Sequence, residues 1–169
     1  MHFSNKYESI GLSGLINLGN TCFINSAVQC LSNVLILTEY FLTKEYVKDL
    51  NKNKKIHNLV INYYNLLEGI WSENCTISPN SFIKTFKDHI KNNEFIGLRQ
   101  NDVQEFLIFF IDGLHEGLSR EVEITISGTP KNDIDKMAID AMTIWKKHFK
   151  DSYSKIIDMF YGQLISTIN

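Results

Sequence analysis

The sequence has few residues of the kinds that break or cross-link a chain. Its 169 residues include two prolines, nine glycines and three cysteines. The cysteines, Cys22, Cys30 and Cys75, are odd in number and form no C-x-x-C pair. This argues against a disulfide framework, a zinc knuckle and a thioredoxin-like site, and we expect no metal and no cofactor. Free thiols suit a reducing compartment, so we expect the protein in the cytoplasm or the nucleus.

An excess of one charge and long apolar runs are also missing. The 17 Lys+Arg and 19 Asp+Glu residues give a formal net charge of −2, which removes any general case for nucleic-acid or membrane partners. The longest apolar runs, residues 34–37 and 106–111, are far shorter than the roughly 20 residues that span a bilayer. Residues 1–5 lack the layout of a signal peptide. With 44 % hydrophobic and 21 % charged residues, a globular core is favoured.

Apolar residues recur at three- and four-residue steps along most of the chain. Over 56–70 this spacing predicts an amphipathic helix. A second helix is predicted to start at Pro79, with Ser78 as its cap.

Three further helices are predicted in the second half of the chain. Asn101 is expected to cap a helix over 103–118, and Gln104, three residues after it, completes a capping-box pattern. Helical spacing returns over 137–149 and again over 154–160, where Ser154 is the expected cap.

The remaining segments have other patterns. Residues 121–126 alternate polar and apolar before a turn cluster at 127–130, which predicts a short strand or hairpin arm. Residues 163–168, after Gly162, also alternate like a strand, and the lysine-rich stretch 44–55 is typical of a solvated loop and helix start. The sequence therefore predicts a mainly α fold of about six helices with a short β arm.

The most informative segment surrounds Cys22. Small, turn-forming residues lead to Thr21, a suitable N-cap, so Cys22 falls in the first turn of a helix. A helix N-terminus carries unpaired N–H groups and about half a positive charge, and both stabilise a thiolate. The same N–H groups and a nearby amide such as Asn17 can donate to a developing oxyanion. On this chemistry alone, packing remains an alternative to catalysis for Cys22, and Cys30 and Cys75 are expected to be structural.

Three segments resemble one protein family. Residues 14–31 read Gly-Leu-Ile-Asn-Leu-Gly-Asn-Thr-Cys-Phe-Ile-Asn-Ser-Ala-Val-Gln-Cys-Leu, which resembles the Cys box of the ubiquitin-specific proteases, a family of papain-like deubiquitinases. Residues 100–107, Gln-Asn-Asp-Val-Gln-Glu-Phe-Leu, are similar to that family's Gln-Gln-Asp-x-x-Glu-Phe-Leu helix start, and Asn101 departs from its second Gln. Residues 156–166 are similar to the stretch that leads into the family's fingers.

The resemblance implies a role for particular residues. Cys22 would be the nucleophile that attacks the carbonyl at the C-terminal glycine of ubiquitin, and Asn17 would donate to the oxyanion together with the Cys22 backbone N–H. Asp102 and Gln104 would bind the extended, arginine-bearing tail of ubiquitin. Asn20 and Gln29 are expected to hold the turn and the neighbouring backbone rather than to touch substrate.

The resemblance also implies a missing part. A thiolate of this kind needs a histidine base and an orienting Asp or Asn. None of the five histidines lies in the Gly-Gly-His-Tyr-like context that the family uses; they are His2, His57, His89, His115 and His148. His148 lies 126 residues after Cys22, but it lies in the lysine-rich end of a helix, where a histidine is ordinary. We therefore expect a second chain or a missing C-terminal half to supply His and Asp.

We expect residues 1–169 to be the N-terminal, thumb portion of a papain-like catalytic domain within an α+β family fold, ending before the fingers and the His box. The predicted activity is thiol-dependent hydrolysis of the bond after the C-terminal glycine of ubiquitin, with ubiquitin and ubiquitinated proteins as partners. The 169-residue chain alone is expected to be inactive. The alternative is a non-catalytic ubiquitin-binding or regulatory fragment. A cysteine phosphatase is disfavoured because residues 23–31 contain no Arg to hold phosphate.

Overall fold

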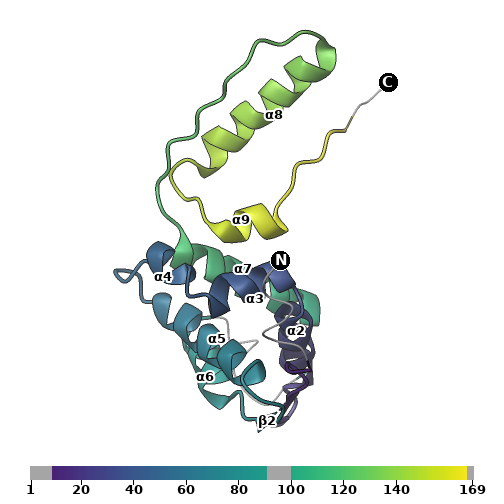
Figure 1. Cartoon of the computed structure of the whole chain (residues 1–169), viewed down its shortest axis with the longest axis vertical. Coiled ribbons are helices and arrows are strands. Elements are labelled where there is room, and N and C mark those ends of the chain that lie inside the picture. Colours follow the sequence, from purple (N-terminus) through teal and green to yellow (C-terminus); the bar gives the residue numbers. More distant parts are fainter. Residues whose placement is uncertain (1–8, 91–99, 167–169) are drawn as a thin grey trace.

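The computed structural model describes residues 9–90 and 100–166 (Figure 1). Within these ranges the chain forms eight helices and two short strands, in agreement with the predicted mainly α fold. They are β1 (Gly14–Leu15), α2 (Cys22–Ser32), α3 (Leu35–Leu42), α4 (Tyr46–Asp49), α5 (His57–Ile70), β2 (Thr76–Ile77), α6 (Asn80–His89), α7 (Val103–Leu118), α8 (Asp133–Phe149) and α9 (Lys155–Phe160). Helices α3 and α4 were not anticipated from the sequence.

Helices α2 to α7 form a helical body around one hydrophobic core. An aromatic cluster lies at its centre and consists of Phe41, Tyr63, Phe82, Phe86, Phe106 and Phe110. Tyr63 meets Phe110 edge-on, with ring centroids 4.9 Å apart, and Phe86 meets Phe106 at 4.8 Å. Edge-to-face contacts of this kind add about 0.5–1.5 kcal/mol each beyond area burial. The cluster therefore ties α3, α5, α6 and α7 together.

Two glycines let α7 approach α5 closely. A Cβ atom on Gly117 would lie 2.5 Å from Val60 Cγ2, and one on Gly113 would lie 2.9 Å from Leu59 Cδ2. Side chains at these positions would force the two helices apart. The predicted helices over 56–70 and 103–118 are confirmed, and their contact is set by these two small residues.

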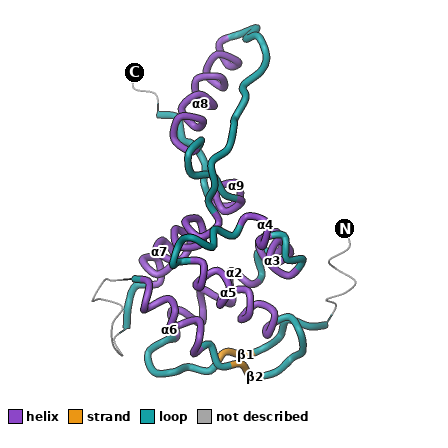
Figure 2. The backbone as a smooth tube through the Cα atoms, turned by 90° about the vertical axis from the view of Figure 1, so that its left-hand side faces the viewer, coloured by secondary structure: helices purple, strands orange, loops and turns teal. Residues whose placement is uncertain are grey.

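The small parallel sheet was not predicted. β1 pairs with β2 in the register Gly14 to Thr76 and Leu15 to Ile77. Figure 2 shows both strands at one end of the molecule, opposite α8. Each strand is two residues long, too short for an alternating pattern to reveal it.

An arm projects from the helical body and consists of residues 120–153, with α8 as its main element (Figures 1 and 2). At its base, Arg120 and Tyr153 exchange two backbone hydrogen bonds of 2.9 and 2.8 Å, and Val122 N–H donates to Lys150 O at 2.8 Å. Helix α8 buries only Phe149. The arm is thus held mainly at its base.

Both predicted β segments are wrong where the structure describes them. Residues 121–126 form no strand, because they run beside α8, whose backbone groups are bonded within the helix except at its end, where Lys150 O accepts from Val122 N–H. Residues 163–166 likewise form no strand, and 167–168 lie outside the described residues. The helix predicted over 137–149 begins earlier, at Asp133, because Asn132 caps it by accepting from Asp135 N–H at 2.8 Å.

Two predicted caps are also wrong. Helix α7 is capped by Asp102 rather than Asn101, since the Asp102 carboxylate accepts from the N–H groups of Gln104 and Glu105. The predicted capping box between Asn101 and Gln104 is therefore replaced by this cap. Helix α6 begins one residue later than predicted, with Pro79 at the N-cap position and no side-chain cap.

Ser154 occupies the predicted N-cap position of α9, but its side chain makes no capping bond. Its hydroxyl lies 2.8 Å from His115 Nδ1 instead and so links α9 to α7. Among the described residues, no single helix is long and apolar enough to cross a membrane; α2 and α3 pass that test only as a pair bent by 84°.

Candidate active site

Cys22 is the first residue of α2, as predicted, and its side chain is exposed. Thr21 is the N-cap by position, but its hydroxyl does not cap the helix. It accepts from Leu18 N–H at 3.0 Å and donates to Asn17 Oδ1 at 3.0 Å. The start of α2 therefore has no cap from the Thr21 side chain and lies next to an exposed thiol. A helix N-terminus favours a thiolate and a nearby anion.

The side chain of Asn17 is held by three hydrogen bonds that all end on its Oδ1. The donors are Gly19 N–H at 3.1 Å, Thr21 N–H at 3.1 Å and the Thr21 hydroxyl. An amide held through its oxygen has a defined orientation, and its Nδ2 group remains to donate to another partner. This is the donor that the predicted oxyanion role of Asn17 requires.

The turn between Asn17 and Cys22 reverses direction through two left-handed residues. Gly19 has φ of 94° and Asn20 has φ of 51°. Glycine adopts this conformation freely, and Asn tolerates it better than most other residues. The predicted turn-forming role of Asn20 is consistent with this backbone.

Side chains of α2 hold the segment that precedes the turn. Gln29 Nε2 donates to Ser13 O at 2.7 Å, which confirms that Gln29 holds neighbouring backbone. Asn25 Nδ2 donates to Leu15 O at 3.3 Å and to Ile16 O at 3.1 Å. Sequence reasoning missed Asn25, because these bonds join residues nine and ten positions apart through the folded turn.

The start of α7 lies close to the start of α2. The rings of Phe23 and Phe106 meet edge-on with centroids 5.9 Å apart, and each ring belongs to the first turns of its helix. This contact brings the predicted substrate-binding residues Asp102 and Gln104 into the neighbourhood of Cys22. Both are exposed.

Asp102 uses Oδ1 for its cap, at 2.7 Å from Gln104 N. A carboxylate has about four acceptor positions, so the cap leaves capacity for a cationic partner. The cap also restricts the carboxylate to one place at the helix start.

The described histidines lie against other groups than Cys22. His57 Nδ1 is 2.7 Å from Lys54 O, and His89 Nε2 is 3.9 Å from a Glu116 carboxylate oxygen. His148 is exposed on α8 in the arm, with its ring against Phe149 at 4.6 Å. Within residues 9–90 and 100–166, no hydrogen bond joins a histidine to Cys22.

His115 lies at the junction between α7 and α9. Its Nδ1 is 2.8 Å from Ser154 Oγ and its Nε2 is 3.4 Å from Ser152 Oγ. Burial lowers the pKa of His115 below its ordinary value of 6.5; Asp112 and Glu116 oppose this shift, and Lys54 adds to it. The neutral imidazole is therefore the favoured form at this junction.

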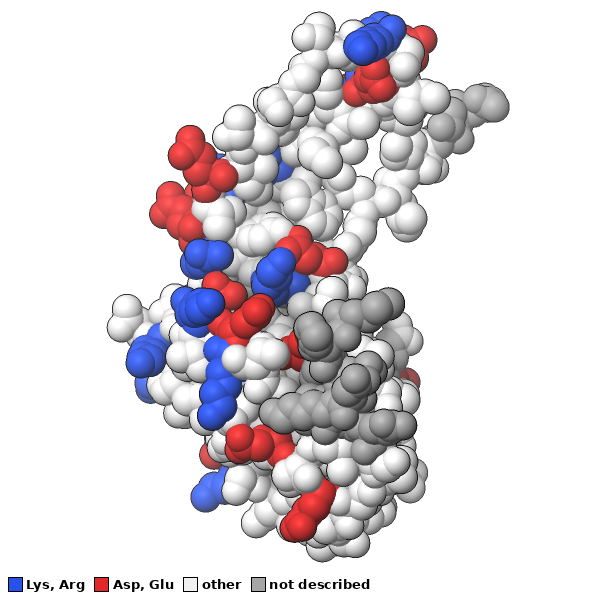
Figure 3. Space-filling view, in the orientation of Figure 1, with Lys and Arg blue, Asp and Glu red and all other residues white. Residues whose placement is uncertain are grey.

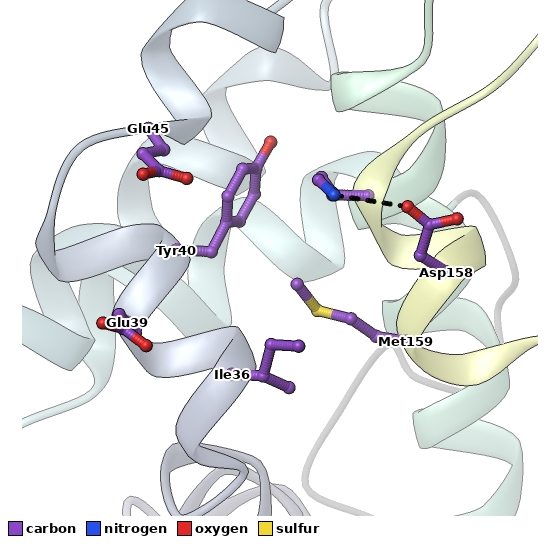
Figure 4. A pocket seen from close by; sticks show the side chains of 7 residues that line it. Ile36, Glu39, Tyr40, Glu45, Asp158 and Met159 are labelled. Carbon is purple, nitrogen blue, oxygen red and sulfur yellow. Dashed lines mark hydrogen bonds and ion pairs between the residues drawn. The ribbon is translucent and has the colours of Figure 1, made fainter. Parts of the chain in front are cut away.

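Two of the cavities lined by described residues lie beside α9. Figure 4 shows one of about 340 Å³ between α3 and α9. Its labelled lining residues are Ile36, Glu39, Tyr40, Glu45, Asp158 and Met159. The other, of about 400 Å³, follows α7 from Gln104 to the end of α9 and is mostly apolar, with Leu107, Ile108 and Phe160 in its lining. Its lining includes Gln104, a predicted substrate-binding residue.

Charged side chains of both signs are interspersed where α4 meets the base of the arm (Figure 3). Arg120 Nε lies 3.3 Å from Asp49 Oδ1, and Asp49 also accepts from the Tyr40 hydroxyl at 2.7 Å. These contacts link the arm to α3 and α4. They lie away from the Cys22 turn and belong to the structural support of the arm.

The turn thus carries an exposed cysteine at a helix start and, five residues before it, an amide of defined orientation. The family model described as "Ubiquitin carboxyl-terminal hydrolase" matches residues 13–169. Ubiquitin carboxyl-terminal hydrolase 2 of Homo sapiens is 38 % identical over 169 residues, which cover 97 % of this chain and 27 % of that relative. Ubiquitin carboxyl-terminal hydrolase 15 of Rattus norvegicus is 39 % identical over 165 residues, covering 95 % of this chain and 17 % of the relative.

The chain belongs to the ubiquitin carboxyl-terminal hydrolase family, which confirms the resemblance found in its sequence. It spans about a quarter or less of the length of these two relatives.

Proposed function

We propose that this chain carries the nucleophile of a cysteine-type deubiquitinase, with ubiquitin and ubiquitinated proteins as its partners. The observation that supports this best is an exposed Cys22 that ends the same turn as the oriented amide of Asn17. Membership of the family adds the substrate class. The cytoplasm or the nucleus is the proposed location.

In the proposed reaction, the Cys22 thiolate attacks the carbonyl carbon of the C-terminal glycine of ubiquitin. A carbon–sulfur bond forms, and the carbonyl oxygen becomes an oxyanion that accepts from Asn17 Nδ2 and the Cys22 N–H. The bond to the leaving amine then breaks, and the amine takes up a proton. Asp102 holds the cationic tail of ubiquitin while this occurs, and Gln104 lines the route that the tail follows.

The leaving amine takes its proton from a residue that acts first as a general base and then as a general acid. We propose that a histidine with its orienting Asp or Asn comes from outside the described residues, either from further polypeptide or from a second chain. The 169-residue chain alone then forms the acyl–enzyme poorly from an amide and turns over little.

The alternative, a non-catalytic ubiquitin-binding or regulatory fragment, is favoured by one observation. The histidines of residues 9–90 and 100–166 lie against groups other than Cys22. An experiment must therefore separate nucleophile competence, turnover and binding.

The test uses a ubiquitin C-terminal aryl thioester, whose leaving group needs no proton. The Cys22 sulfur–carbon bond forms, the bond to the aryl thiolate breaks, and the thiolate leaves with its electron pair. We expect a covalent ubiquitin adduct on the wild-type chain and no adduct on Cys22→Ala. The controls Cys30→Ala and Cys75→Ala replace the other two exposed cysteines and should retain the adduct.

The other outcomes are equally informative. Ubiquitin binding without an adduct supports the alternative, and neither binding nor an adduct overturns both functions. Cys22-dependent release of a fluorophore from a ubiquitin amide at an ordinary enzymatic rate would show that one of the five histidines is the base, and His148 would be the first to replace.

A further inference from the structure

The backbone that leads to Asn17 is held on one side by β2. Gly14 N–H donates to Cys75 O at 3.0 Å, and Ile16 N–H donates to Ile77 O at 2.9 Å. These bonds use the donors of alternate residues, as expected for a strand. They anchor the segment to the part of the chain that follows α5.

On its other side the same backbone is held by α2. The carbonyl groups of Leu15 and Ile16 accept from Asn25 Nδ2, and that of Ser13 accepts from Gln29 Nε2. Side chains of α2 thus bind the carbonyl groups of Ser13, Leu15 and Ile16. The N–H groups of Gly14 and Ile16 in the same segment are bound by the backbone of Cys75 and Ile77. The last of these acceptors, Ile16 O, lies in the peptide unit that joins Ile16 to Asn17.

The helix face that makes these bonds is the face that carries the nucleophile. Cys22, Asn25 and Gln29 are spaced at i, i+3 and i+7, so they lie along one side of α2. A single rigid helix therefore presents the thiol and holds the backbone before the oxyanion donor. The distance between the Cys22 thiol and the Asn17 amide therefore depends on the side chains that join α2 to this backbone, Asn25 and Gln29.

Asn25 and the bonds inside the turn have different tasks. The three bonds to Asn17 Oδ1 set the rotation of the amide, whereas the Asn25 bonds set the position of the backbone that carries it. Among the described residues, Asn25 Oδ1 is buried and has no hydrogen-bond partner, so the bonding of this amide goes through Nδ2.

We propose that Asn25 is a positioning residue that holds the Asn17 oxyanion donor in register with Cys22. This inference rests on the proposed function for its chemical consequence. An oxyanion donor accelerates a reaction only where it meets the developing charge, and a displacement of about 1 Å can cost on the order of 10²-fold in rate. Asn25 touches no reacting atom and acts through Asn17.

The experiment follows acylation of Cys22 by the ubiquitin aryl thioester. We expect Asn25→Ala to lower the rate at saturating thioester by roughly 10- to 100-fold, with the half-saturating concentration within about twofold of wild type. Asn33→Ala is the matched control, since it removes an amide bond to a backbone carbonyl, Gln29 O, at the other end of α2. It should acylate at the wild-type rate.

A double variant separates positioning from a general structural role. If Asn25 acts through Asn17, then Asn25→Ala should lower the rate by no more than about threefold in a chain that already carries Asn17→Ala. Multiplied losses in the double variant would overturn the proposal, as would a wild-type rate in Asn25→Ala. If Asn25→Ala does not fold, Asn25→Asp keeps the shape without the donor and is judged by the same criteria.

A second measurement does not depend on activity. Amide hydrogen exchange at Gly19 and Thr21, whose N–H groups donate to Asn17 Oδ1, should be at least about tenfold faster in Asn25→Ala and unchanged in Asn33→Ala. If the wild-type chain is not acylated, the proposed function fails, and this exchange alone decides whether Asn25 holds the turn. Unchanged exchange would overturn the proposal.

Discussion

The helical body and the arm use apolar residues in opposite ways. Helix α5 of the body buries seven side chains, whereas α8 of the arm, which is three residues longer, buries only Phe149. Ile134 and Met142 of α8 are 77 % and 59 % exposed. The body is stabilised by packing, and the arm depends on its cap and on a few contacts at its base. The site of Cys22 lies on the body, whose packing fixes it in place.

The largest difference between the body and the arm is expected in the free energy of unfolding, when one apolar side chain is removed from each. Phe110→Ala removes a fully buried ring from the aromatic cluster and should lower the free energy of unfolding by about 3–5 kcal/mol. Met142→Ala in the arm should change it by less than about 0.5 kcal/mol. Urea unfolding measures both, and similar losses would show that the arm is packed as tightly as the body.

Replacement of Asp102 tests the N-cap of α7, a helix of the body. Asp102→Asn retains a good N-cap but removes the charge, so ubiquitin should bind about tenfold more weakly while the free energy of unfolding stays unchanged. Asp102→Ala should weaken binding similarly and also destabilise the fold by about 1 kcal/mol. Titration with ubiquitin and urea unfolding separate the two effects. Unchanged ubiquitin affinity in Asp102→Asn would remove Asp102 from the site.

Replacement of Asn132 tests the N-cap of α8, the helix of the arm. Asn132→Ala should destabilise α8 by about 1 kcal/mol, because its side chain caps the helix by accepting from Asp135 N–H. Amide exchange in the first turn of α8 should rise about fivefold, and the urea midpoint of the body should not move. Asn132→Asp, which retains a cap, is the control. A lowered midpoint would mean that arm and body unfold together.

The smallest effect is expected at the junction, where His115 meets Ser154. Because burial lowers the pKa of His115 below 6.5, the unfolded chain binds more protons than the folded chain just below that pH. Stability should therefore fall as the pH decreases through this range and be independent of His115 above it. His115→Gln should flatten this dependence, and His148→Gln, at an exposed position, should leave it intact. Equal slopes in all three proteins would contradict the burial of a neutral imidazole.

The sequence predicted what depends on neighbouring residues. The helices over 57–70 and 103–118 have continuous buried stripes, and Cys22 follows a turn that the residue types themselves favour. The choice between Asn101 and Asp102 as a cap was not decidable from residue type, since both side chains cap well.

Features that depend on distant partners were missed or wrongly assigned. The alternation at 121–126 is real, but a strand needs another strand beside it, and α8 lies there instead. The pairing of β1 with β2 and the bonds from Asn25 exist only once the chain is folded. The Asn17 amide is oriented by Gly19 and Thr21, which are near in sequence, but the position of the backbone that carries it follows from the distant contacts. The sequence therefore indicated the residue but not the geometry that suits it to its proposed role.

The parallel pairing of Gly14 with Thr76 has a consequence for the order of events during protein synthesis. A ribosome that adds roughly 5–20 residues per second reaches Ile77 about 3 to 11 s after it has added Cys22. Until then Gly14 and Ile16 lack the acceptors to which they donate in the finished protein. The nascent chain therefore carries Cys22 for some seconds before the backbone that leads to Asn17 is held in place, and the geometry on which the proposed function rests forms only with β2.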